Sequence, residues 1–478
     1  MSRKPILVFD GDCGFCRLWI ERWCSATGDR VEYEPYQTAA ARFPRVPRER
    51  FTEAVHLFEP GGRDSRGAEA ALRALSHAPG ASWLPRAYAL PGFAFIAEAI
   101  YRFIADRRVV FSRLTRLLWG ESAVPAPVDR AARLVLSGIG ACYLVAFVSF
   151  GVQVRGLIGA EGIIPAASML EAAKAQLGPA RFWTLPTLAW LASSDAALSA
   201  FCWLGAALSF GLLLGVAAAP CALACWALYL SLSTVGFDFM SFQWDALLLE
   251  AGVIACFLPS PSGKTGPSRG ALRLMRLLLV KLMIQSGLVK ILSHDPSWRD
   301  LTALSYHYWT QPLPTPLAWW AARLPLWAHK ATCAGMFAVE LGAPLLIFLP
   351  RKARALGAGA IVALMLGIAA TGNYGFFNLL ALVLGLACLD DRLLFKEPAG
   401  RAPRTPRPAG PARGRVVAAF GVLWLLVSGI QTAAMLGVAP AAPARALLAA
   451  VYPARAINHY GRFAVMTQNR DEIALEGA

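Results

Sequence analysis

The chain has 478 residues, of which 56% are apolar and 16% are charged, and its mean hydropathy is +0.48. Soluble domains carry about a quarter charged residues, so this composition excludes an ordinary soluble protein. The formal net charge is +16, but the basic residues fall in short segments between apolar runs, as in the cytoplasmic loops of membrane proteins. We therefore expect membrane lipid, and no nucleic acid, as the partner of this charge.

Residues 1–119 predict a small α/β domain. Its expected elements are strands at 5–9 and 31–34, a hairpin over 54–66, and helices over 13–24 and 67–75. The apolar stretch Ile6–Phe9 is too short for the hydrophobic region of a secretory signal. We therefore expect this domain to remain in the cytoplasm, where thiols are kept reduced.

Cys13 and Cys16 form a Cys-Gly-Phe-Cys motif at the start of the first expected helix. Backbone amides without helical partners and the helix dipole favour a thiolate there, so we expect Cys13 to be the nucleophile. Cys16 lies one turn later on the same face, where it can attack a mixed disulfide and release the partner. The alternative is half of a zinc site, for which Cys24, His56 and His77 are the nearest further ligands in the sequence. We favour redox chemistry with no metal and no cofactor beyond the Cys13–Cys16 disulfide.

Three segments of this domain resemble the DCC family of predicted thiol-disulfide oxidoreductases: FDGDCGFC at 9–16, GAEA at 67–70 and YRFIADRR at 101–108. The resemblance covers about residues 4–119 and implies a thioredoxin-like fold. It also implies that Cys13 is the nucleophile and Cys16 the resolving cysteine. Asp10 and Asp12 belong to the same motif. We interpret them as supporting residues that cap the helix, with tuning of the thiols as the alternative.

After a proline-containing linker at 120–130, residues 131–478 predict an all-α polytopic transmembrane bundle. About nine membrane helices are expected, at 131–153, 196–219, 220–235, 244–259, 271–292, 332–349, 353–371, 374–389 and 416–438. With the N-terminus inside, three strongly basic loops become cytoplasmic and two loops without basic residues lie outside. These are 260–276, 350–354 and 390–415 on the inside, and 236–243 and 372–378 on the outside. The pattern predicts a multi-pass cell-membrane protein with a cytoplasmic N-terminal domain and an outer C-terminus.

Glu250, Lys281 and Glu340 are ionisable residues within expected membrane helices. An ionised side chain at the centre of a membrane helix costs a few kcal/mol, so it usually faces a partner or a wet cavity. We predict that Lys281 pairs with Glu250 or Glu340. Alternatively, each group lies near an interface and reaches the headgroups. The seven cysteines from Cys142 onward fall in or beside apolar helices, and we interpret them as small buried residues.

The expected outer loop 293–331 begins with a stretch rich in polar residues, aromatics and prolines, SHDPSWRDLTALSYHYWTQPLPTP at 293–316. Long ordered loops tend to be functional. An aromatic belt at the headgroup level is the alternative, and both interpretations can hold together. The candidate site residues of this loop are Asp295, Trp298, Arg299, His307, Tyr308 and Gln311.

This stretch resembles the lipase maturation factor family. The matching segments are GLVK at 287–290, DPSWRDLTAL at 295–304, YHY at 306–308, TQPLP at 310–314, TGNYGFFN at 371–378 and NHYGRFAVM at 458–466. The resemblance runs from about residue 130 to the end and implies a polytopic membrane factor that assists folding or assembly of secreted lipases. The superfamily also looks related to vitamin K-dependent carboxylases. The family normally continues beyond a segment similar to 471–477 into a further soluble region.

Three functions of different classes fit these patterns. The first is a membrane-anchored thiol-disulfide oxidoreductase linked to a folding or assembly factor, with a secreted lipase client and a thiol redox partner. The second is a non-enzymatic membrane chaperone for secreted lipases. The third is a quinone- or lipid-handling membrane enzyme related to the carboxylases. In the first, a cytoplasmic Cys13 would not oxidise an exported client directly.

Overall fold

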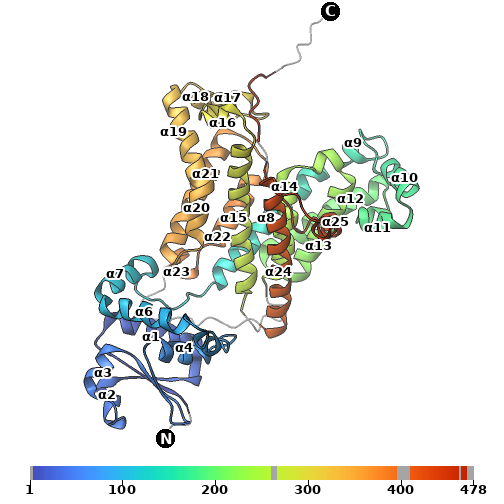
Figure 1. Cartoon of the computed structure of the whole chain (residues 1–478). Helices are drawn as coiled ribbons and strands as arrows, with labels where there is room; N and C mark the ends of the chain where they lie inside the picture. Colours follow the sequence, from blue (N-terminus) through green and yellow to red (C-terminus); the bar gives the residue numbers. More distant parts are fainter. Residues whose placement is uncertain (1–3, 260–265, 396–409, 462–463, 471–478) are drawn as a thin grey trace, which may run out of the picture. The chain divides into compact units, whose positions relative to one another are not determined.

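The structure is a computed structural model that describes residues 4–259, 266–395, 410–461 and 464–470. Two compact units divide the chain: residues up to Ala126 together with 350–352, and the remainder from Pro127. The segment similar to 471–477 and parts of the basic loops and of the NHYGRFAVM motif lie outside the described residues. Figure 1 shows the elements of both units.

The first unit is built on a four-stranded mixed sheet in the order β2-β1-β3-β4. The strands are β1 (Ile6–Phe9), β2 (Glu32–Pro35), β3 (His56–Phe58) and β4 (Asp64–Arg66). β1 runs parallel to β2 and antiparallel to β3, which pairs antiparallel with β4. Because successive side chains point to opposite faces, Leu7 and Phe9 enter one core cluster while Ile6 and Val8 enter another. The apolar run of β1 therefore reflects burial on both faces.

Helices cover both faces of this sheet (Figure 1). They are α1 (Gly14–Thr27), α2 (Tyr36–Ala39), α3 (Arg48–Glu53), α4 (Gly67–Ser76), α5 (Leu84–Tyr88), α6 (Phe93–Asp106) and α7 (Arg108–Trp119). Side chains of α1 and α4 pack on Leu7 and Phe9, whereas Phe51 of α3 packs on Ile6 and Val8. The β1–α1–β2 unit and the following hairpin and helix confirm the predicted α/β fold class.

The second unit is helical. Its main helices are α8 (Asp129–Gly151), α12 (Asp195–Leu214), α13 (Ala218–Val235), α14 (Gln243–Cys256), α15 (Arg269–Leu292), α19 (Leu326–Phe337), α21 (Arg351–Thr371), α22 (Phe377–Leu386), α24 (Pro411–Met435) and α25 (Ala442–Val451). Further helices occupy the predicted loops: α9 (Val154–Ile158), α10 (Ala166–Leu177), α11 (Arg181–Thr184), α16 (Pro296–Arg299), α17 (Ala303–Thr310), α18 (Pro316–Ala322) and α23 (Asp391–Leu394). A helix stands at each predicted membrane position.

Within the described chain, six helices are long and apolar enough to cross a membrane. They are Asp129–Gly151, Asp195–Leu214, Ala218–Val235, Leu326–Ile347, Arg351–Thr371 and Ala412–Met435. The protein is therefore a multi-pass membrane protein. The other three predicted spans do not reach this length or apolarity: α14 has 14 residues and α22 has 10, while α15 contains basic side chains along its length. A count of nine spans stays a prediction.

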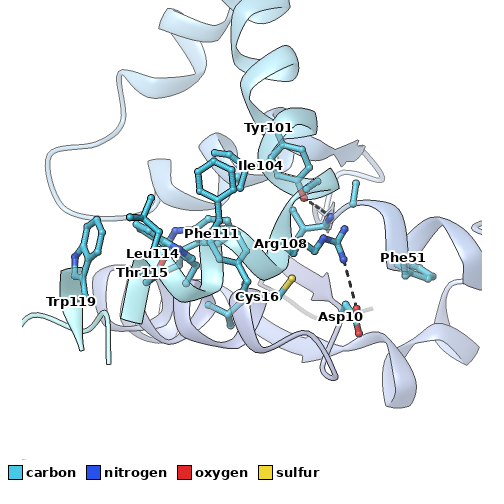
Figure 2. A pocket seen from close by; sticks show the side chains of 18 of the residues that line it. Asp10, Cys16, Phe51, Tyr101, Ile104, Arg108, Phe111, Leu114, Thr115 and Trp119 are labelled. Carbon is cyan, nitrogen blue, oxygen red and sulfur yellow. Dashed lines mark hydrogen bonds and ion pairs between the residues drawn. The ribbon is translucent and has the colours of Figure 1, made fainter. Parts of the chain in front are cut away.

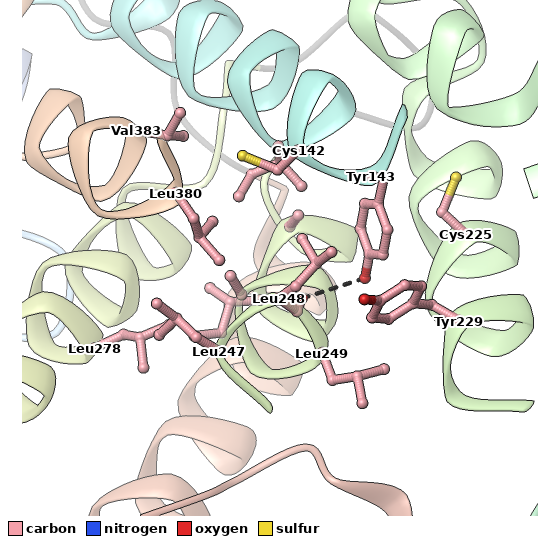
Figure 3. Packing of buried hydrophobic residues seen from close by; sticks show 14 of the residues in the cluster. Cys142, Tyr143, Cys225, Tyr229, Leu247, Leu248, Leu249, Leu278, Leu380 and Val383 are labelled. Carbon is pink, nitrogen blue, oxygen red and sulfur yellow. Dashed lines mark hydrogen bonds between the residues drawn. The ribbon is translucent and has the colours of Figure 1, made fainter. Parts of the chain in front are cut away.

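The core of the second unit includes residues of α8, α12, α13, α14, α15, α21, α22 and α24. Figure 3 shows Tyr143 and Tyr229 facing each other there, with ring centroids 5.7 Å apart, and the Tyr143 hydroxyl donates to the carbonyl of Leu248 at 3.3 Å. Cys142 and Cys225 are buried in the same cluster, as small apolar residues are. Of the seven later cysteines, Cys256 alone is partly exposed.

Candidate functional site

Cys13 and Cys16 lie at the beginning of α1. Cys13 is the N-cap residue, and its Sγ accepts a hydrogen bond from the backbone amide of Cys16 at 3.3 Å. Both cysteines are free thiols with partial exposure. At an N-cap, amides without helical partners and the positive end of the helix dipole favour negative charge on a side chain. The position is therefore suited to thiolate chemistry.

Cys16 has a different environment from Cys13. Burial, followed by the hydrogen bond with Cys13 and its charge, raises the pKa of the Cys16 thiol well above its usual value. The positive charge of Arg108 on α7 lowers the pKa of Cys16, but by less than burial and Cys13 raise it. A thiol that stays protonated is a poor nucleophile, so this environment does not suit Cys16 to attack a disulfide first.

Asp10 and Asp12 of the motif stabilise the turn before α1 through hydrogen bonds. Asp10 Oδ1 accepts from the amide of Asp12 at 3.1 Å and from Gln37 Nε2 at 3.2 Å, and Asp12 Oδ2 accepts from Gln37 Nε2 at 3.0 Å. Gln37 Oε1 in turn accepts from the amide of Gly11 at 3.2 Å. The prediction that Asp10 and Asp12 cap the helix was wrong, because Cys13 occupies the N-cap.

A cavity of about 440 Å³ lies beside Cys16, within the first unit (Figure 2). Its size suits a ligand or an inserted side chain. At its polar part, Arg108 Nη1 lies 3.7 Å from Asp10 Oδ2, and the Tyr101 hydroxyl accepts from the amide of Val55 at 3.0 Å. Most of the lining is apolar, including Phe15, Trp19, Trp23, Phe111, Leu114 and Trp119 from α1 and α7.

The lining of this cavity contains residues to which the sequence analysis gave no role. Tyr101 and Arg108 stand at the two ends of the YRFIADRR segment, which was quoted as a resemblance only. Gln37 of α2 does not line the cavity but contacts Asp10 and Asp12, and the sequence analysis gave it no role either. The resemblance of the YRFIADRR segment to the DCC family is the feature of the sequence that could have pointed to Tyr101 and Arg108. Within the described ranges, no group of three His, Cys, Asp or Glu side chains comes together around the dithiol or elsewhere in a way that could hold a metal ion.

Glu250 of α14 is the centre of a buried network in the second unit. Its Oε1 accepts from Lys281 Nζ at 2.5 Å and from Trp424 Nε1 at 2.6 Å. Its Oε2 accepts from the amide of Asn458 and from the hydroxyl of Tyr460, both at 2.7 Å. Each carboxylate oxygen thus has two donors, which is how a buried charge is stabilised. The structure places Lys281 beside Glu250, one of the two partners predicted for it.

Glu340 pairs with Lys290 instead of Lys281. It lies in a π-helical turn, Ala338–Gly342, between α19 and α20 (Ala343–Ile347), and its two oxygens lie 2.7 and 2.9 Å from Lys290 Nζ. The ammonium of Lys290 also lies 5.5 Å from the ring centroid of Trp298. The sequence analysis missed Lys290 as an intramembrane charge, although it falls within the predicted span 271–292.

The candidate residues of the loop 293–331 divide into two groups, and the first surrounds Asp295. Asp295 Oδ1 accepts from the amide of Ser297 at 2.8 Å, and Oδ2 accepts from the amide of Met466 at 2.6 Å. Burial alone would raise the pKa of Asp295, but these hydrogen bonds hold it below its usual value. Trp298 is buried and packs edge-on against Phe337. This group joins the loop to the chain near its C-terminal end.

The second group contains His307 and Gln311 with Tyr374. The Tyr374 hydroxyl donates to Gln311 Oε1 at 3.0 Å and lies 3.2 Å from His307 Nε2. Burial, with a smaller effect of the Lys290 charge, lowers the pKa of His307 to about 4. Tyr308 packs near the ring of His329, with centroids 5.8 Å apart.

The side chain of Arg299 is exposed, and its backbone amide donates to the carbonyl of Asp295 at 3.3 Å. Tyr374 belongs to the TGNYGFFN segment, and the sequence analysis assigned it no role. Asn458 and Tyr460 of the NHYGRFAVM segment were likewise quoted without a partner, yet both bind Glu250. The family segments therefore meet one another through hydrogen bonds across the second unit.

Comparison with known proteins agrees with both units. The chain is a multi-pass membrane protein with an N-terminal domain that matches the model of the DCC1-like thiol-disulfide oxidoreductase over residues 7–114. The model of the lipase maturation factor transmembrane domain matches residues 130–396. The chain belongs to the lipase maturation factor family, which confirms both resemblances. No solved structure matches it.

Curated relatives show how much of the family's length is present. Lipase maturation factor 2 of Rattus norvegicus is 43% identical over 290 residues, which cover 56% of this chain and 41% of the relative. Lipase maturation factor 1 of Bos taurus is 32% identical over 379 residues, covering 72% and 66%, and that of Mus musculus is 31% identical over 395 residues, covering 73% and 68%. The chain thus spans less than half the length of the lipase maturation factor 2 relative.

Proposed function

We propose that this protein is a membrane-anchored folding or assembly factor for secreted lipases, and that its N-terminal domain is an active thiol-disulfide oxidoreductase. Family membership and the names of the relatives support the first part. One observation carries the second part: Cys13 Sγ caps α1, accepts the Cys16 amide, and lies one turn before a thiol that lines an apolar cavity.

The proposed reaction is a two-step exchange. The Cys13 thiolate attacks one sulfur of a partner disulfide, forming a mixed disulfide and releasing the other partner sulfur as a thiolate. Cys16 then loses its proton and attacks Cys13 Sγ, which releases the second partner sulfur. The partner gains two electrons, and the Cys13–Cys16 dithiol becomes a disulfide. The raised pKa of Cys16 keeps it protonated until the first step is complete.

The apolar cavity supplies the contact with the thiol redox partner. An apolar side chain next to the partner's cysteine would enter between α1 and α7, with Phe15 and Phe111 on either side. The Asp10–Arg108 pair would hold polar backbone at the edge of the cavity. The reaction needs no cofactor beyond the Cys13–Cys16 disulfide itself.

The proposed orientation places the first unit in the cytoplasm and the C-terminus on the outer side, because basic loops favour the inner side. In this orientation the dithiol exchanges with a cytoplasmic partner, and the outer loops of the second unit meet the exported lipase. The two activities therefore act on opposite sides of the membrane. Membrane lipid surrounds the candidate spans.

Trapping of the mixed disulfide tests the redox part. In full-length protein purified in detergent, Cys16→Ser should accumulate a covalent adduct with a peptide disulfide, because the resolving thiol is missing. Cys13→Ser should form no adduct at this motif, and Cys24→Ser serves as the control cysteine variant. Equal adduct formation by Cys13→Ser and Cys16→Ser would contradict the assigned roles.

Lipase secretion tests the folding part. Co-expression of the full chain with a secreted lipase should increase the secreted activity relative to cells without it. The Cys13→Ser variant separates the two activities: retained secretion with lost exchange identifies a non-enzymatic chaperone. The saturated networks around Glu250 and Glu340 favour this second candidate, since they fix helix positions without presenting a reactive group.

A further inference from the structure

Helices α6 and α7 of the first unit expose a large apolar surface. Phe95 is 76% exposed and Val109 is 67% exposed. Soluble domains rarely expose a contiguous apolar patch of this kind, and where one occurs it marks a protein or membrane contact. The other exposed apolar residues on these two helices are Phe93, Ile96, Ile100, Phe103, Val110, Leu114 and Leu117.

Seven of the nine large apolar residues exposed on α6 and α7 follow the helical repeat, and Phe95 and Val109 lie outside these spacings. On α6, Phe93, Ile96, Ile100 and Phe103 are spaced three or four positions apart, and so are Val110, Leu114 and Leu117 on α7. Tyr101 and Ile104 of α6 and Phe111 and Thr115 of α7 line the cavity beside α1. Leu114 lies at the boundary, since it lines the cavity and is also exposed. Each helix therefore has one apolar side in the domain and a second apolar stripe facing outward.

The charges between these stripes are mostly basic. The exposed side chains Arg102, Arg113 and Arg116 lie on these two helices. Arg107 lies between the helices, and its guanidinium is 4.3 Å from the ring centroid of Phe103. Asp106, at the end of α6, is an exposed acidic residue. Glu98 is engaged within the domain, where it accepts from Tyr88 and from the amide of Glu69. Apolar stripes bordered by arginines are typical of helices that lie in the interface of an anionic membrane.

The chain itself keeps this surface close to a bilayer. α7 ends at Trp119, and the first candidate membrane span begins at Asp129. The intervening segment can extend by at most about 3.5 Å per residue, so it reaches roughly 30 Å. This segment therefore limits how far α7 can lie from the first candidate span. A soluble partner would have to compete with the nearby lipid for the apolar surface of α6 and α7.

We propose that the α6–α7 pair lies in the interfacial layer of the membrane that the same chain spans. Its apolar stripes enter the boundary between headgroups and acyl chains, and its arginines contact anionic headgroups. Since Phe111 and Leu114 of α7 also line the cavity beside Cys16, the dithiol works at the membrane surface. The proposal does not depend on redox activity, so its failure is distinguishable from failure of the exchange reaction.

Photocrosslinking in a bilayer tests the proposal. The photoreactive amino acid p-benzoylphenylalanine replaces Phe95 or Leu117 in the full chain, which is placed in nanodiscs of phosphatidylcholine with phosphatidylglycerol. The control position is Arg45, which is exposed and precedes α3 on the other face of the sheet. After irradiation, mass spectrometry identifies the adducts. We expect lipid adducts at Phe95 and Leu117 that exceed those at Arg45 by roughly ten-fold, because acyl chains surround only the first two positions.

Three other outcomes would overturn the proposal. Adducts from Phe95 or Leu117 to helices of the second unit would show that the protein covers its own surface. Adducts to a second copy of the chain would assign the surface to self-association. Lipid adducts no more frequent than at Arg45 also contradict it. These substitutions are at exposed positions, and unchanged chromatographic behaviour verifies folding for each variant.

A charge-reversal pair tests the role of the arginines. Arg102→Glu with Arg113→Glu should lower the lipid adducts at Phe95 in phosphatidylglycerol nanodiscs, and the difference should shrink in pure phosphatidylcholine. Arg45→Glu with Arg48→Glu changes the net charge equally on the opposite face of the sheet and should leave the adducts unchanged. Equal loss with both pairs would contradict a specific contact.

Discussion

The ionisable side chains of the two units differ in their access to other molecules. In the first unit, Cys13 and Cys16 are partly exposed at a helix start, next to a cavity large enough to admit another molecule. In the second unit, Glu250 and Glu340 are enclosed, and donors from other helices occupy their oxygens. A reactive group needs access and room for a partner, whereas a saturated buried charge fixes the arrangement of the elements that satisfy it.

This difference explains how the family segments act in the second unit. Asn458 and Tyr460 bind Glu250, Met466 binds Asp295, and Tyr374 binds Gln311. Residues far apart in sequence are therefore connected through polar contacts inside an apolar bundle. Such contacts specify which helices are neighbours, because any other arrangement would leave a buried donor or acceptor unpaired. The network defines the fold on which client binding would depend.

The largest expected effect is on stability, from breaking the Glu250 network. Glu250→Ala leaves Lys281 buried without its carboxylate, which typically costs about 3–5 kcal/mol. We expect a marked loss of folded protein and a lower melting temperature in detergent. The double variant Glu250→Gln with Lys281→Met should recover much of the loss, because no charge stays unpaired. A single variant as stable as the wild type would contradict the structural role of the network.

The second effect concerns the pH dependence of the His307 group. The pKa of His307 is about 4 in the folded protein, below the usual value of about 6.5. The unfolded chain therefore binds the proton first, and stability contributed by neutral His307 is complete above pH 6.5. It is lost as the pH falls from 6.5 toward 4, by up to about 3 kcal/mol.

Melting temperatures of wild type and His307→Gln across this pH range measure the effect. The glutamine variant should lose less stability on acidification than the wild type, since it cannot be protonated at this position. Tyr374→Phe is the matched variant, because it removes the neighbouring hydroxyl and keeps the imidazole. Parallel pH curves for wild type and His307→Gln would exclude this account.

A smaller effect is expected on the resolving step. Arg108 lowers the pKa of Cys16 against the larger effects of burial and Cys13. Arg108→Gln should therefore slow release of the mixed disulfide by several-fold, about what a pKa change of less than one unit allows. The pH profile of release should move to higher pH. Arg107→Gln is the control, since Arg107 is adjacent in sequence but does not line the cavity. Equal slowing in both variants would contradict a direct effect on Cys16.

The smallest expected effect concerns Tyr101, whose hydroxyl accepts from the amide of Val55. Tyr101→Phe removes one hydrogen bond and leaves the ring in the cluster around Leu7. The expected cost is about 1 kcal/mol, measured by chemical unfolding of the full chain. Tyr36→Phe, on the opposite face of the sheet, should cost less. A larger loss for Tyr36→Phe would mean that Tyr101 does not support the edge of β3.

Local patterns predicted most of the first unit. The alternation in β1, the turn glycines and the apolar period of α1 and α4 are set by neighbours in sequence, and these elements lie where expected. The positions of Cys13 and Cys16 at the helix start follow from the same local rules. The sequence could not show that Cys13 itself is the N-cap, because capping depends on the backbone angles of one residue.

Long-range pairing was harder to predict. The choice between Glu250 and Glu340 for Lys281 depends on which helices are neighbours, and helical periodicity does not contain that information. Lys290 was overlooked because it stands near the end of its helix, where a lysine usually reaches the headgroups. The exposed apolar residues of α6 have the same spacing in sequence as the residues of a helix face that packs in a core. Exposure of Phe95 and Ile100 could therefore be seen only after the helix was placed against α1 and α4.

The measurement that tests the central claim most directly is a redox titration of the full-length protein. The chain, with Cys24→Ser, is equilibrated in glutathione buffers of graded potential, and mass-resolved alkylation then counts the oxidised Cys13–Cys16 pairs. We predict one two-electron transition that disappears in both Cys13→Ser and Cys16→Ser. Failure to form a disulfide between these residues at any potential would contradict an oxidoreductase domain in this membrane protein.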